Sequence, residues 1–295
     1  MNYRTRCPHY ERPTVKVLVF GGNGRLGRDL QRYTGGLSAL HVTYTRSPSP
    51  SPSDLPQVDV TDASQVLAAV ARFTPDVVLH LASITGAAAD ADPERATAVN
   101  VTSMAHVIDA ARAHPVQRIV FVSSSGVYGD QYDSPIDETG ALAPASLYAR
   151  TKVAAEELLR QAVDEGAIPA AVILRVFNMF GEKFDGSLVS RLLGSTEESP
   201  VALRGPDNFV RDYVHVDDVM PSLISSLSNP LPTPLSIYNI GSGIAVSNRE
   251  LVDELSKSQT IHTTVTPGER SYSCANIARA TRDLGLTPTR GLITR

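Results

Sequence analysis

The sequence predicts an α/β protein with a Rossmann-type, doubly wound parallel sheet and a smaller second lobe. Short β-branched runs alternate with longer helical patterns along most of the chain, which is typical of a parallel sheet flanked by helices. The runs are apolar on both faces, as expected for strands that are buried between two helical layers. A glycine-rich turn joins the first run to the first helical pattern, which favours the Rossmann arrangement over other α/β folds.

Each element follows from its local pattern. Six runs predict strands, at Val15–Phe20, His41–Thr45, Val77–Leu81, Ile119–Ser123, Ala171–Val176 and Ile237–Ile240. Five amphipathic stretches predict helices, at Gly24–Tyr33, Asp62–Phe73, Pro93–His114, Ser146–Glu165 and Val216–Leu227. The stretch Ser47–Pro56 alternates serine with proline and therefore predicts a surface loop.

The regularity of these patterns also predicts the domain organisation. Residues 1–14 are polar and basic and are expected to form a loose N-terminal extension. Residues 15–177 and 211–241 carry the strand and helix alternation of the Rossmann domain. Residues 178–210 and 242–295 have weaker patterns, and we expect them to form a smaller substrate-binding lobe.

Bulk composition excludes several classes of protein. The 295 residues carry a net charge of −4 and no long basic run, so nucleic acid is not an expected partner. No stretch has the length of a membrane span, and the N-terminus lacks the apolar run of a signal peptide. Cys7 and Cys274 lie in no metal-ligand or C-x-x-C spacing. We therefore expect a cytoplasmic protein without disulfides or a bound metal.

The turn after the first strand has the chemistry of a dinucleotide site. Gly21, Gly24 and Gly27 follow the spacing G-x-x-G-x-x-G and enclose Arg25 and Leu26. The first two glycines allow a tight turn close to a pyrophosphate, and the third allows the helix to pack against the strand. The helix N-terminus adds partial positive charge. A glycine turn without a ligand is the alternative, but its position between a strand and a helix argues against it.

The end of the second strand indicates which dinucleotide binds. An acidic residue normally stands there to hold the ribose hydroxyls of NAD, but this chain has Arg46 followed by Ser47. Because arginine pairs well with a 2′-phosphate, we expect NADP, with NAD as the alternative. Arg46 could instead be a surface residue at the mouth of the loop. Asp59 and Val60 are expected to line the adenine.

A second set of residues predicts proton chemistry. Ser124 and Ser125 follow the fourth strand, at the edge of the sheet where open α/β folds bind ligands. Tyr148 and Lys152 are four residues apart and lie on one face of a long helix. A nearby ammonium group and an oxidised nicotinamide both favour the phenolate form of tyrosine. A serine hydroxyl could orient the oxygen of the substrate.

Together these motifs resemble the extended short-chain dehydrogenases/reductases of the NAD-dependent epimerase/dehydratase family, over Val15–Pro288. Further segments carry the resemblance: His80-Leu81-Ala82-Ser83, Asp92-Pro93, Asn100-Val101, Leu174 to Gly181, and Arg211 to Val219.

The resemblance implies a role for individual residues. Ser124 would donate to the substrate oxygen, Tyr148 would act as acid and base, and Lys152 would bind the ribose and lower the pKa of Tyr148. Asn178 and Arg211 would hold the diphosphate of a nucleotide sugar. Three residues at the end of the third strand would add to the cofactor site: Leu81, Ala82 and Ser83. Ser125 would add to the substrate site.

Two activities and one function without activity remain open at this point. Ser124-Ser125-Gly126 stands where sugar dehydratases of this family have Thr-Asp-Glu, which argues against dehydration. Arg46 favours a reductase that transfers hydride from NADPH to a 4-keto sugar. The alternatives are a C4 epimerase with tightly bound NAD and, in another class, a dinucleotide sensor without activity. The resemblance also implies a homodimer through the helices Pro93–His114 and Ser146–Glu165.

Two conspicuous motifs have simpler interpretations. His80 ends a buried strand and is expected to be a packed residue beside the cofactor and not a base or metal ligand. Asp217 and Asp218 look like a metal pair but are expected to cap the helix that starts there.

Overall fold

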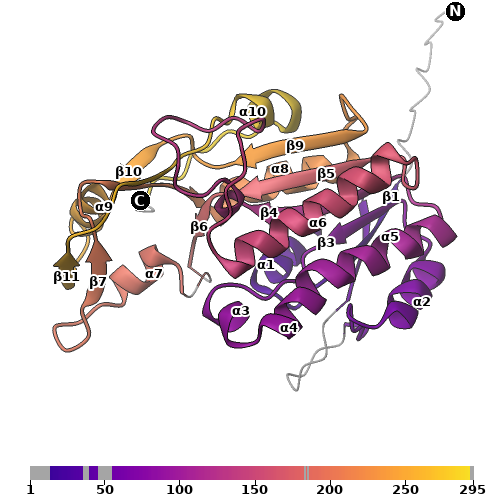
Figure 1. Cartoon of the computed structure of the whole chain (residues 1–295), viewed down its shortest axis with the longest axis horizontal. Coiled ribbons are helices and arrows are strands. Elements are labelled where there is room, and N and C mark those ends of the chain that lie inside the picture. Colours follow the sequence, from indigo (N-terminus) through magenta and orange to yellow (C-terminus); the bar gives the residue numbers. More distant parts are fainter. Residues whose placement is uncertain (1–13, 36–39, 46–54, 183, 185, 293–295) are drawn as a thin grey trace, which may run out of the picture.

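The computed structural model describes residues 14–35, 40–45, 55–182, 184 and 186–292. Its centre is a six-stranded parallel sheet. The strands are, in order across the sheet, β2 (Leu40–Tyr44), β1 (Val15–Phe20), β3 (Val77–His80), β4 (Arg118–Ser124), β5 (Ala171–Val176) and β9 (Leu235–Ile240). Helices cover both faces, so the predicted Rossmann-type fold class is confirmed (Figure 1). All six predicted strands are present, with ends within two residues of those expected.

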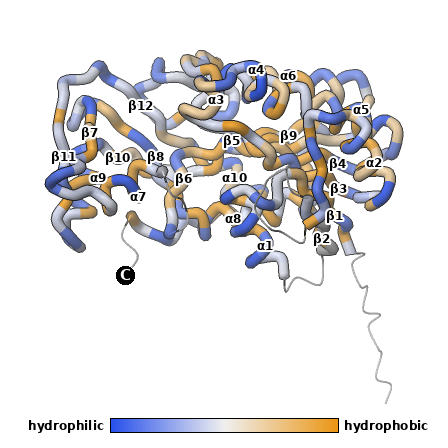
Figure 2. The backbone as a smooth tube through the Cα atoms, turned by 90° about the horizontal axis from the view of Figure 1, so that it is seen from below, coloured by the Kyte–Doolittle hydropathy of each residue, from blue (hydrophilic) through white to orange (hydrophobic). Residues whose placement is uncertain are grey.

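Two apolar cores lie on opposite faces of this sheet. On one face, buried side chains of the sheet pack against three helices: α2 (Ala63–Phe73), α5 (Ser103–Ala113) and α6 (Leu147–Asp164). On the other face they pack against α1 (Arg25–Thr34), α8 (Val216–Ser228) and α10 (Ala278–Leu284). The strands accordingly contain the most hydrophobic residues of the chain and lie in the middle of the molecule (Figure 2). Burial on both faces explains why their sequences show no polar alternation.

The predicted helix Pro93–His114 is three segments in the structure. It consists of α4 (Pro93–Thr97), a π-helical turn at Ala98–Thr102 and α5. π-turns widen a helix locally and occur often at functional sites. Here the π-turn carries Asn100, a buried residue whose side-chain amide is hydrogen-bonded to the hydroxyls of Ser83 and Thr151.

A smaller part of the chain lies beside one end of the sheet, on the left of Figure 1. Strand β8 (Phe209–His215) is its centre and pairs with β6 (Asn178–Phe180), β10 (Ala245–Ser247) and β12 (Ser271–Ser273). The remaining α-helices and strands are α3 (Ala87–Ala91) in the main part and α7 (Leu188–Leu193), β7 (Val201–Arg204), α9 (Asn248–Leu255) and β11 (Thr263–Thr266) in the smaller part.

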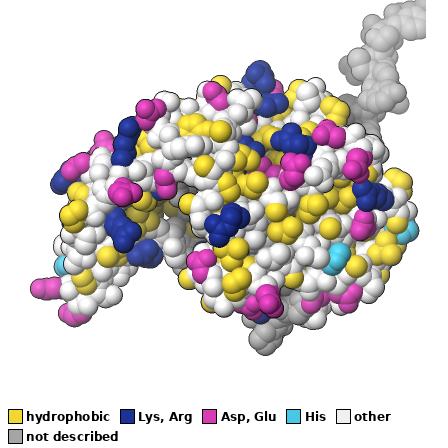
Figure 3. Space-filling view, viewed as in Figure 1, with side chains coloured by type: hydrophobic (Ala, Val, Ile, Leu, Met, Phe, Trp, Pro, Cys, Tyr) yellow, Lys and Arg dark blue, Asp and Glu magenta, His cyan; other side chains and the backbone are white. Residues whose placement is uncertain are grey.

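The surface is indented where the two parts meet (Figure 3). The domain boundaries stay a prediction. Helix α10, which belongs to the second sequence segment of the predicted lobe, packs on the central sheet. Within the described part of the chain, no helix is long and apolar enough to cross a membrane.

Candidate active site

The glycine turn between β1 and α1 is held in a shape that only glycine fits. Gly21 has a φ of +87°, and a Cβ there would lie 2.6 Å from the backbone nitrogen of Ala82. A Cβ on Gly27 would lie 2.6 Å from the carbonyl oxygen of Gly22. Both positions thus bring backbone against backbone, which is the requirement deduced from the spacing. The amide of Gly24 bonds to the carbonyl of Gly21 at 3.0 Å and completes the turn.

This turn forms one wall of a cleft of about 390 Å³. The cleft is lined by Gly21, Gly24, Arg25, Leu26, Gly27, Arg28, Leu81, Ser83, Thr85, Val122, Tyr148, Lys152, Met179 and Phe184. The first turn of α1, which opens towards it, contains no acidic residue. A backbone cradle at a helix N-terminus suits a pyrophosphate, so the residues present fit a dinucleotide.

The residues expected to select the adenine end are described only in part. Arg46 and Ser47, on which the NADP prediction rests, lie outside the described residues. The Asp59 carboxylate accepts hydrogen bonds from the backbone amide and hydroxyl of Thr61, at 2.9 and 2.7 Å. Val60 is buried. The contact of Asp59 and Val60 with adenine therefore stays a prediction, as does the choice of NADP.

Ser124, Tyr148 and Lys152 come together at the carboxyl edge of the sheet. Tyr148 lies in the first turn of α6, and its hydroxyl is hydrogen-bonded to the side chains of Ser124 and Ser83. The Lys152 Nζ donates to the carbonyl of Val122 at 2.9 Å and lies 5.6 Å from the centre of the Tyr148 ring. The first turn of α6 is stabilised by Ser146, whose hydroxyl caps the amide of Ala149.

Burial has the largest effect on the pKa values of Tyr148 and Lys152. It raises the pKa of Tyr148 to about 12, against the effect of the hydrogen bonds with Ser124 and Ser83. Burial also lowers the pKa of Lys152 to about 7, while the Glu156 carboxylate acts in the opposite direction. In the polypeptide by itself, burial therefore outweighs the groups that favour the phenolate form of Tyr148. A phenolate at neutral pH needs a further positive charge beside Tyr148.

Glu156 and Arg175 form a buried ion pair next to Ser124, Tyr148 and Lys152. Glu156 lies one turn after Lys152 on α6, and its side chain is 3% exposed. It accepts from Arg175 of β5, with Nη2 at 2.7 Å and Nε at 3.2 Å, and also from the hydroxyl of Ser123. Arg175 in turn donates to the hydroxyl of Tyr128 at 2.9 Å. This network connects α6 to the end of β4, where the next residue is Ser124.

The Asn100 side chain holds the other side of the cleft. Its Oδ1 accepts from the hydroxyl of Ser83 at 3.1 Å and from the amide of Ile84 at 2.8 Å. Its Nδ2 donates to the hydroxyl of Thr151 on α6 at 3.0 Å. Ser83, a partner of the Tyr148 hydroxyl, is therefore fixed by a residue that the sequence showed only as part of a family motif.

Two further cavities lie near this cleft. One, of about 270 Å³, is lined by Ser124, Ser125, Gly126, Gly129, Asp130, Ala145, Ser146, Asn178, Arg211 and Ser273. The other, of about 370 Å³, is lined by Asn178, Met179, Gly186, Ser187, Leu188, Arg191, Phe209, Arg211 and Tyr213. Asn178 and Arg211 line both, and all four predicted substrate residues line the first of these cavities.

Arg211 is held rigidly between these two cavities. Its guanidinium group lies 3.7 Å from the centre of the Phe209 ring. Its Nη2 donates to Ser271 at 2.6 Å and to the Asp130 carboxylate at 3.2 Å. The Asn178 Nδ2 donates to the carbonyl of Asp212, which fixes the second shared residue. Sequence reasoning missed Asp130, although it directly follows the Val127-Tyr128-Gly129 segment that adjoins the serine run.

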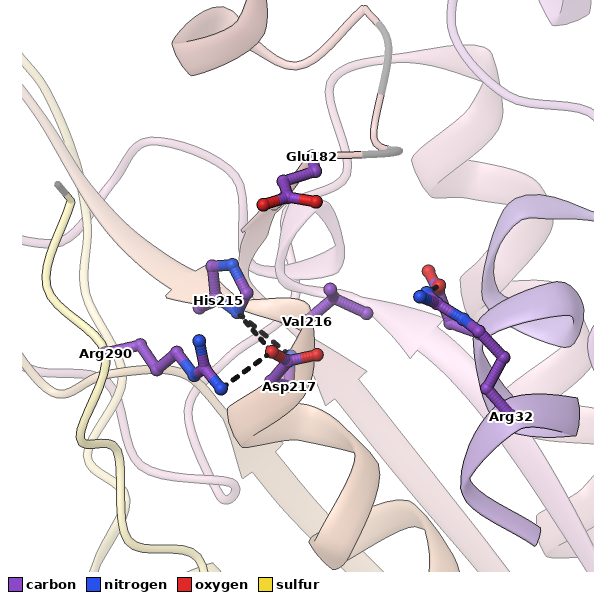
Figure 4. Close-up of a pocket in the computed structure, with 7 residues that line it drawn as sticks. Arg32, Glu182, His215, Val216, Asp217 and Arg290 are labelled. Carbon is purple, nitrogen blue, oxygen red and sulfur yellow. Dashed lines mark hydrogen bonds and ion pairs between the residues drawn. The ribbon is translucent and has the colours of Figure 1, made fainter. Parts of the chain in front are cut away.

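A separate, small cavity of about 100 Å³ contains mainly charged side chains (Figure 4). Asp217 faces His215 and pairs with Arg290 at 3.1 Å. Asp218 accepts from the hydroxyl of Thr289 and the amide of Arg290. The prediction that the two aspartates cap α8 is wrong, because the cap is the His215 side chain, which accepts from the amide of Asp217. The aspartates instead attach the segment at 289–290 to the first turn of α8.

His80 is a packed residue, as expected. Its Nε2 is 2.8 Å from the Ser103 hydroxyl, and burial lowers its pKa to about 3, with a smaller effect of Lys152 in the same direction. Among the residues that the structure describes, no group of three or more His, Cys, Asp or Glu side chains is arranged to hold a metal ion.

Comparisons with known proteins agree with this geometry. The model of the NAD dependent epimerase/dehydratase family matches residues 17–241. A UDP-glucose 4-epimerase of Lactobacillus helveticus is 28% identical, over 87% of this chain and 85% of its own. The structure of MoeE5 in complex with UDP-glucuronic acid and NAD is 27% identical, with a TM-score of 0.80, and the match covers 94% of this chain and 95% of that chain. The complex of a Thermus thermophilus UDP-glucose 4-epimerase with NAD is 26% identical, with a TM-score of 0.78 and 94% of both chains covered.

Proposed function

The chain belongs to the NAD-dependent epimerase/dehydratase family of short-chain dehydrogenases/reductases, and we propose that it is a nucleotide-sugar 4-epimerase that uses bound NAD. The observation that carries the proposal is the position of Ser124, Tyr148 and Lys152 between a dinucleotide cleft and a cavity with small, hydroxyl-bearing walls. Relatives named as 4-epimerases and structural neighbours that contain NAD support the same assignment.

The residues of the cleft have complementary tasks in this proposal. The backbone at Gly21, Gly24 and Gly27 would hold the pyrophosphate of NAD, and Lys152 would hold the nicotinamide ribose. NAD, when bound, supplies the hydride acceptor and the positive charge of an oxidised nicotinamide. That charge favours the phenolate of Tyr148, whose pKa the polypeptide alone raises to about 12.

Tyr148 then acts as the base at the C4 hydroxyl. It removes the hydroxyl proton as C4 is oxidised. It returns a proton to the same oxygen after the keto sugar has rotated in the site to present its other face. Ser124 shares the hydrogen bond of this oxygen and orients it. Rotation of the keto sugar requires space. The cavity next to Ser124 is lined by the small residues Gly126, Gly129 and Ala145, which leave room for it. Asn178 and Arg211 hold the diphosphate at the junction of the two outer cavities, so that only the sugar moves.

The epimerase proposal replaces the keto-sugar reductase that the sequence favoured. That preference rested on Arg46, which lies outside the described residues, and no comparison specifically supports NADPH-dependent reduction. The reactions differ in net redox change. An epimerase returns the hydride to the sugar and consumes no dinucleotide, whereas a reductase consumes one NADPH for each sugar.

The test uses purified protein and a small panel of sugar nucleotides. We expect UDP-glucose and UDP-galactose, or dTDP sugars, to interconvert without a change in absorbance at 340 nm, and we expect NAD to be released on denaturation. Stoichiometric oxidation of NADPH by a 4-keto sugar nucleotide would instead establish the reductase. A protein that retains NAD and converts no sugar in the panel would contradict the proposal.

Two further expectations belong to this proposal. The alanine-rich helices within Pro93–His114 and Ser146–Glu165 would form the interface of a homodimer, with each active site inside one subunit. The expected location is the cytoplasm, where sugar nucleotides are the small-molecule partners, with neither nucleic acid nor membrane involved.

A further inference from the structure

The Asp130 carboxylate occupies a fixed place in the wall of the cavity next to Ser124. Gly129, which precedes it, has a φ of +69°, and a Cβ at Gly129 would collide with the carbonyl oxygen of Ala143. The backbone therefore enters Asp130 in a conformation that other residues rarely adopt. Its carboxylate is bound by Arg211 at 3.2 Å and by the Ser271 hydroxyl. The side chain is still 53% exposed, and Asp130 is one of the residues that line the cavity.

The charges around this cavity are already matched. In the described lining, Arg211 is the cation and Asp130 the anion, and the remaining groups are hydroxyls, an amide, glycine and alanine. The Arg211 guanidinium group is only 15% exposed and is committed to Asp130, Ser271 and the carbonyl of Val210. In the proposed function Arg211 also receives the diphosphate. A second anion in this cavity would therefore lie near Asp130 without a cation of its own.

We propose that Asp130 makes this cavity select nucleotide sugars with a neutral sugar and disfavour those whose sugar carries a carboxylate. The inference rests on the proposed function, because it takes the cavity next to Ser124 as the sugar site. Hydroxyl groups of a neutral sugar find donors and acceptors in Ser124, Ser125, Ser146 and Asp130 itself. A uronic acid, by contrast, places its C6 carboxylate in the same cavity as the Asp130 carboxylate.

The test compares UDP-glucose with UDP-glucuronic acid, which differ only at C6, in the wild-type protein and in Asp130→Asn. Asparagine keeps an oxygen for Arg211 and Ser271 but removes the charge. We expect the wild type to have the higher kcat/KM for UDP-glucose. We expect Asp130→Asn to reduce the ratio of the two kcat/KM values roughly tenfold, through better use of the uronic acid. The ratio is the readout because any general effect on Arg211 changes both substrates equally.

Asp133→Asn is the matched control, since it removes one charge from an exposed residue of the same loop outside the cavity. It should leave the ratio unchanged. A wild type that uses both substrates within threefold, or an Asp130→Asn variant with an unchanged ratio, would overturn the inference. Asp130→Ser is a second variant that also removes the charge, and melting temperatures report whether each variant is folded.

Binding separates failure of this inference from failure of the proposed function. Dissociation constants of both sugar nucleotides, measured by calorimetry on the NAD-loaded protein, do not depend on turnover. A protein that binds both ligands but epimerises neither would refute the 4-epimerase, while the ratio of the two constants would still decide the role of Asp130. A protein that binds neither would refute both.

Discussion

Substitution of Glu156 by glutamine tests whether the buried ion pair beneath the active site stabilises the protein. The side chains of Glu156 and Arg175 are 3% and 2% exposed, and Nη2 and Oε2 are 2.7 Å apart. The glutamine of the variant keeps the size of the side chain and one acceptor oxygen. It leaves the Arg175 guanidinium group buried without a counter-ion, in contact with Tyr128 and the carbonyl of Glu138.

The magnitude follows from the distance and the burial. At 2.7 Å the Coulomb attraction is about 6 kcal/mol for an effective dielectric constant of 20. Much of it offsets the desolvation of the two charges, so the pair itself adds little. Removal of one partner leaves the desolvation of the other, which costs about 3–5 kcal/mol. At about 2–4 °C per kcal/mol, we expect the melting temperature of Glu156→Gln to fall by roughly 6 °C or more.

Calorimetry of the wild type and three variants is the assay. Glu157→Gln is the matched control, because Glu157 is the next residue of α6 and forms an exposed pair with Arg160. Such pairs contribute about 0–1 kcal/mol. The double variant Glu156→Gln, Arg175→Met removes both charges and should recover part of the loss. If Glu156→Gln lowers the melting temperature no more than Glu157→Gln does, the reasoning is refuted.

Three further predictions concern the cleft and the buried histidine. Tyr148→Phe should lower kcat by at least about 100-fold while NAD still co-purifies, and near-normal turnover would exclude Tyr148 as the base. Gly27→Ala should lose bound NAD, because its Cβ meets the Gly22 carbonyl, whereas Gly35→Ala should retain it, because its nearest neighbour is 3.5 Å away. The pKa of His80 is lowered by burial from 6.5 to about 3, so between these values the unfolded state binds the extra proton. The free energy of unfolding should therefore decrease as the pH falls through this range, by up to about 1.4 kcal/mol per unit. His80→Asn should lose that part of the pH dependence, and an identical slope in urea titrations at several pH values would argue against it.

The central sheet and the catalytic helix could be predicted because their signals are local. The run Ala171–Val176 is apolar throughout except for Arg175, and all six residues are buried in β5. The helix of Tyr148 and Lys152 starts at a serine cap that the sequence shows directly. In both places a period or a cap fixes the structure within a few residues, and tertiary contacts agree with it.

The parts that were missed depend on contacts between distant residues. Nothing in the local pattern of Pro93–His114 predicts a π-turn at Ala98–Thr102, which brings Asn100 against Ser83 and Thr151. The short strands of the smaller part form because they pair with β8, and alone they are too weak to recognise. The partner of Asp130 is 81 residues away in the sequence. A pattern within one window carries no information on such pairs.

The same physical cause links the stability of the site to its chemistry. Lys152 and Glu156 lie on one face of α6, one turn apart, and both are buried. Burial lowers the pKa of Lys152, and Glu156 partly compensates by favouring the ammonium form. Glu156 is paired there with Arg175, and Arg175 is itself held by Tyr128 from the segment that follows Ser124. The charge on Lys152 thus depends on a chain of groups that also aligns Ser124 with Tyr148. A variant that weakens this chain should therefore lose stability and catalytic rate together, whereas a variant at Asp130 should change the relative use of neutral and uronic sugars.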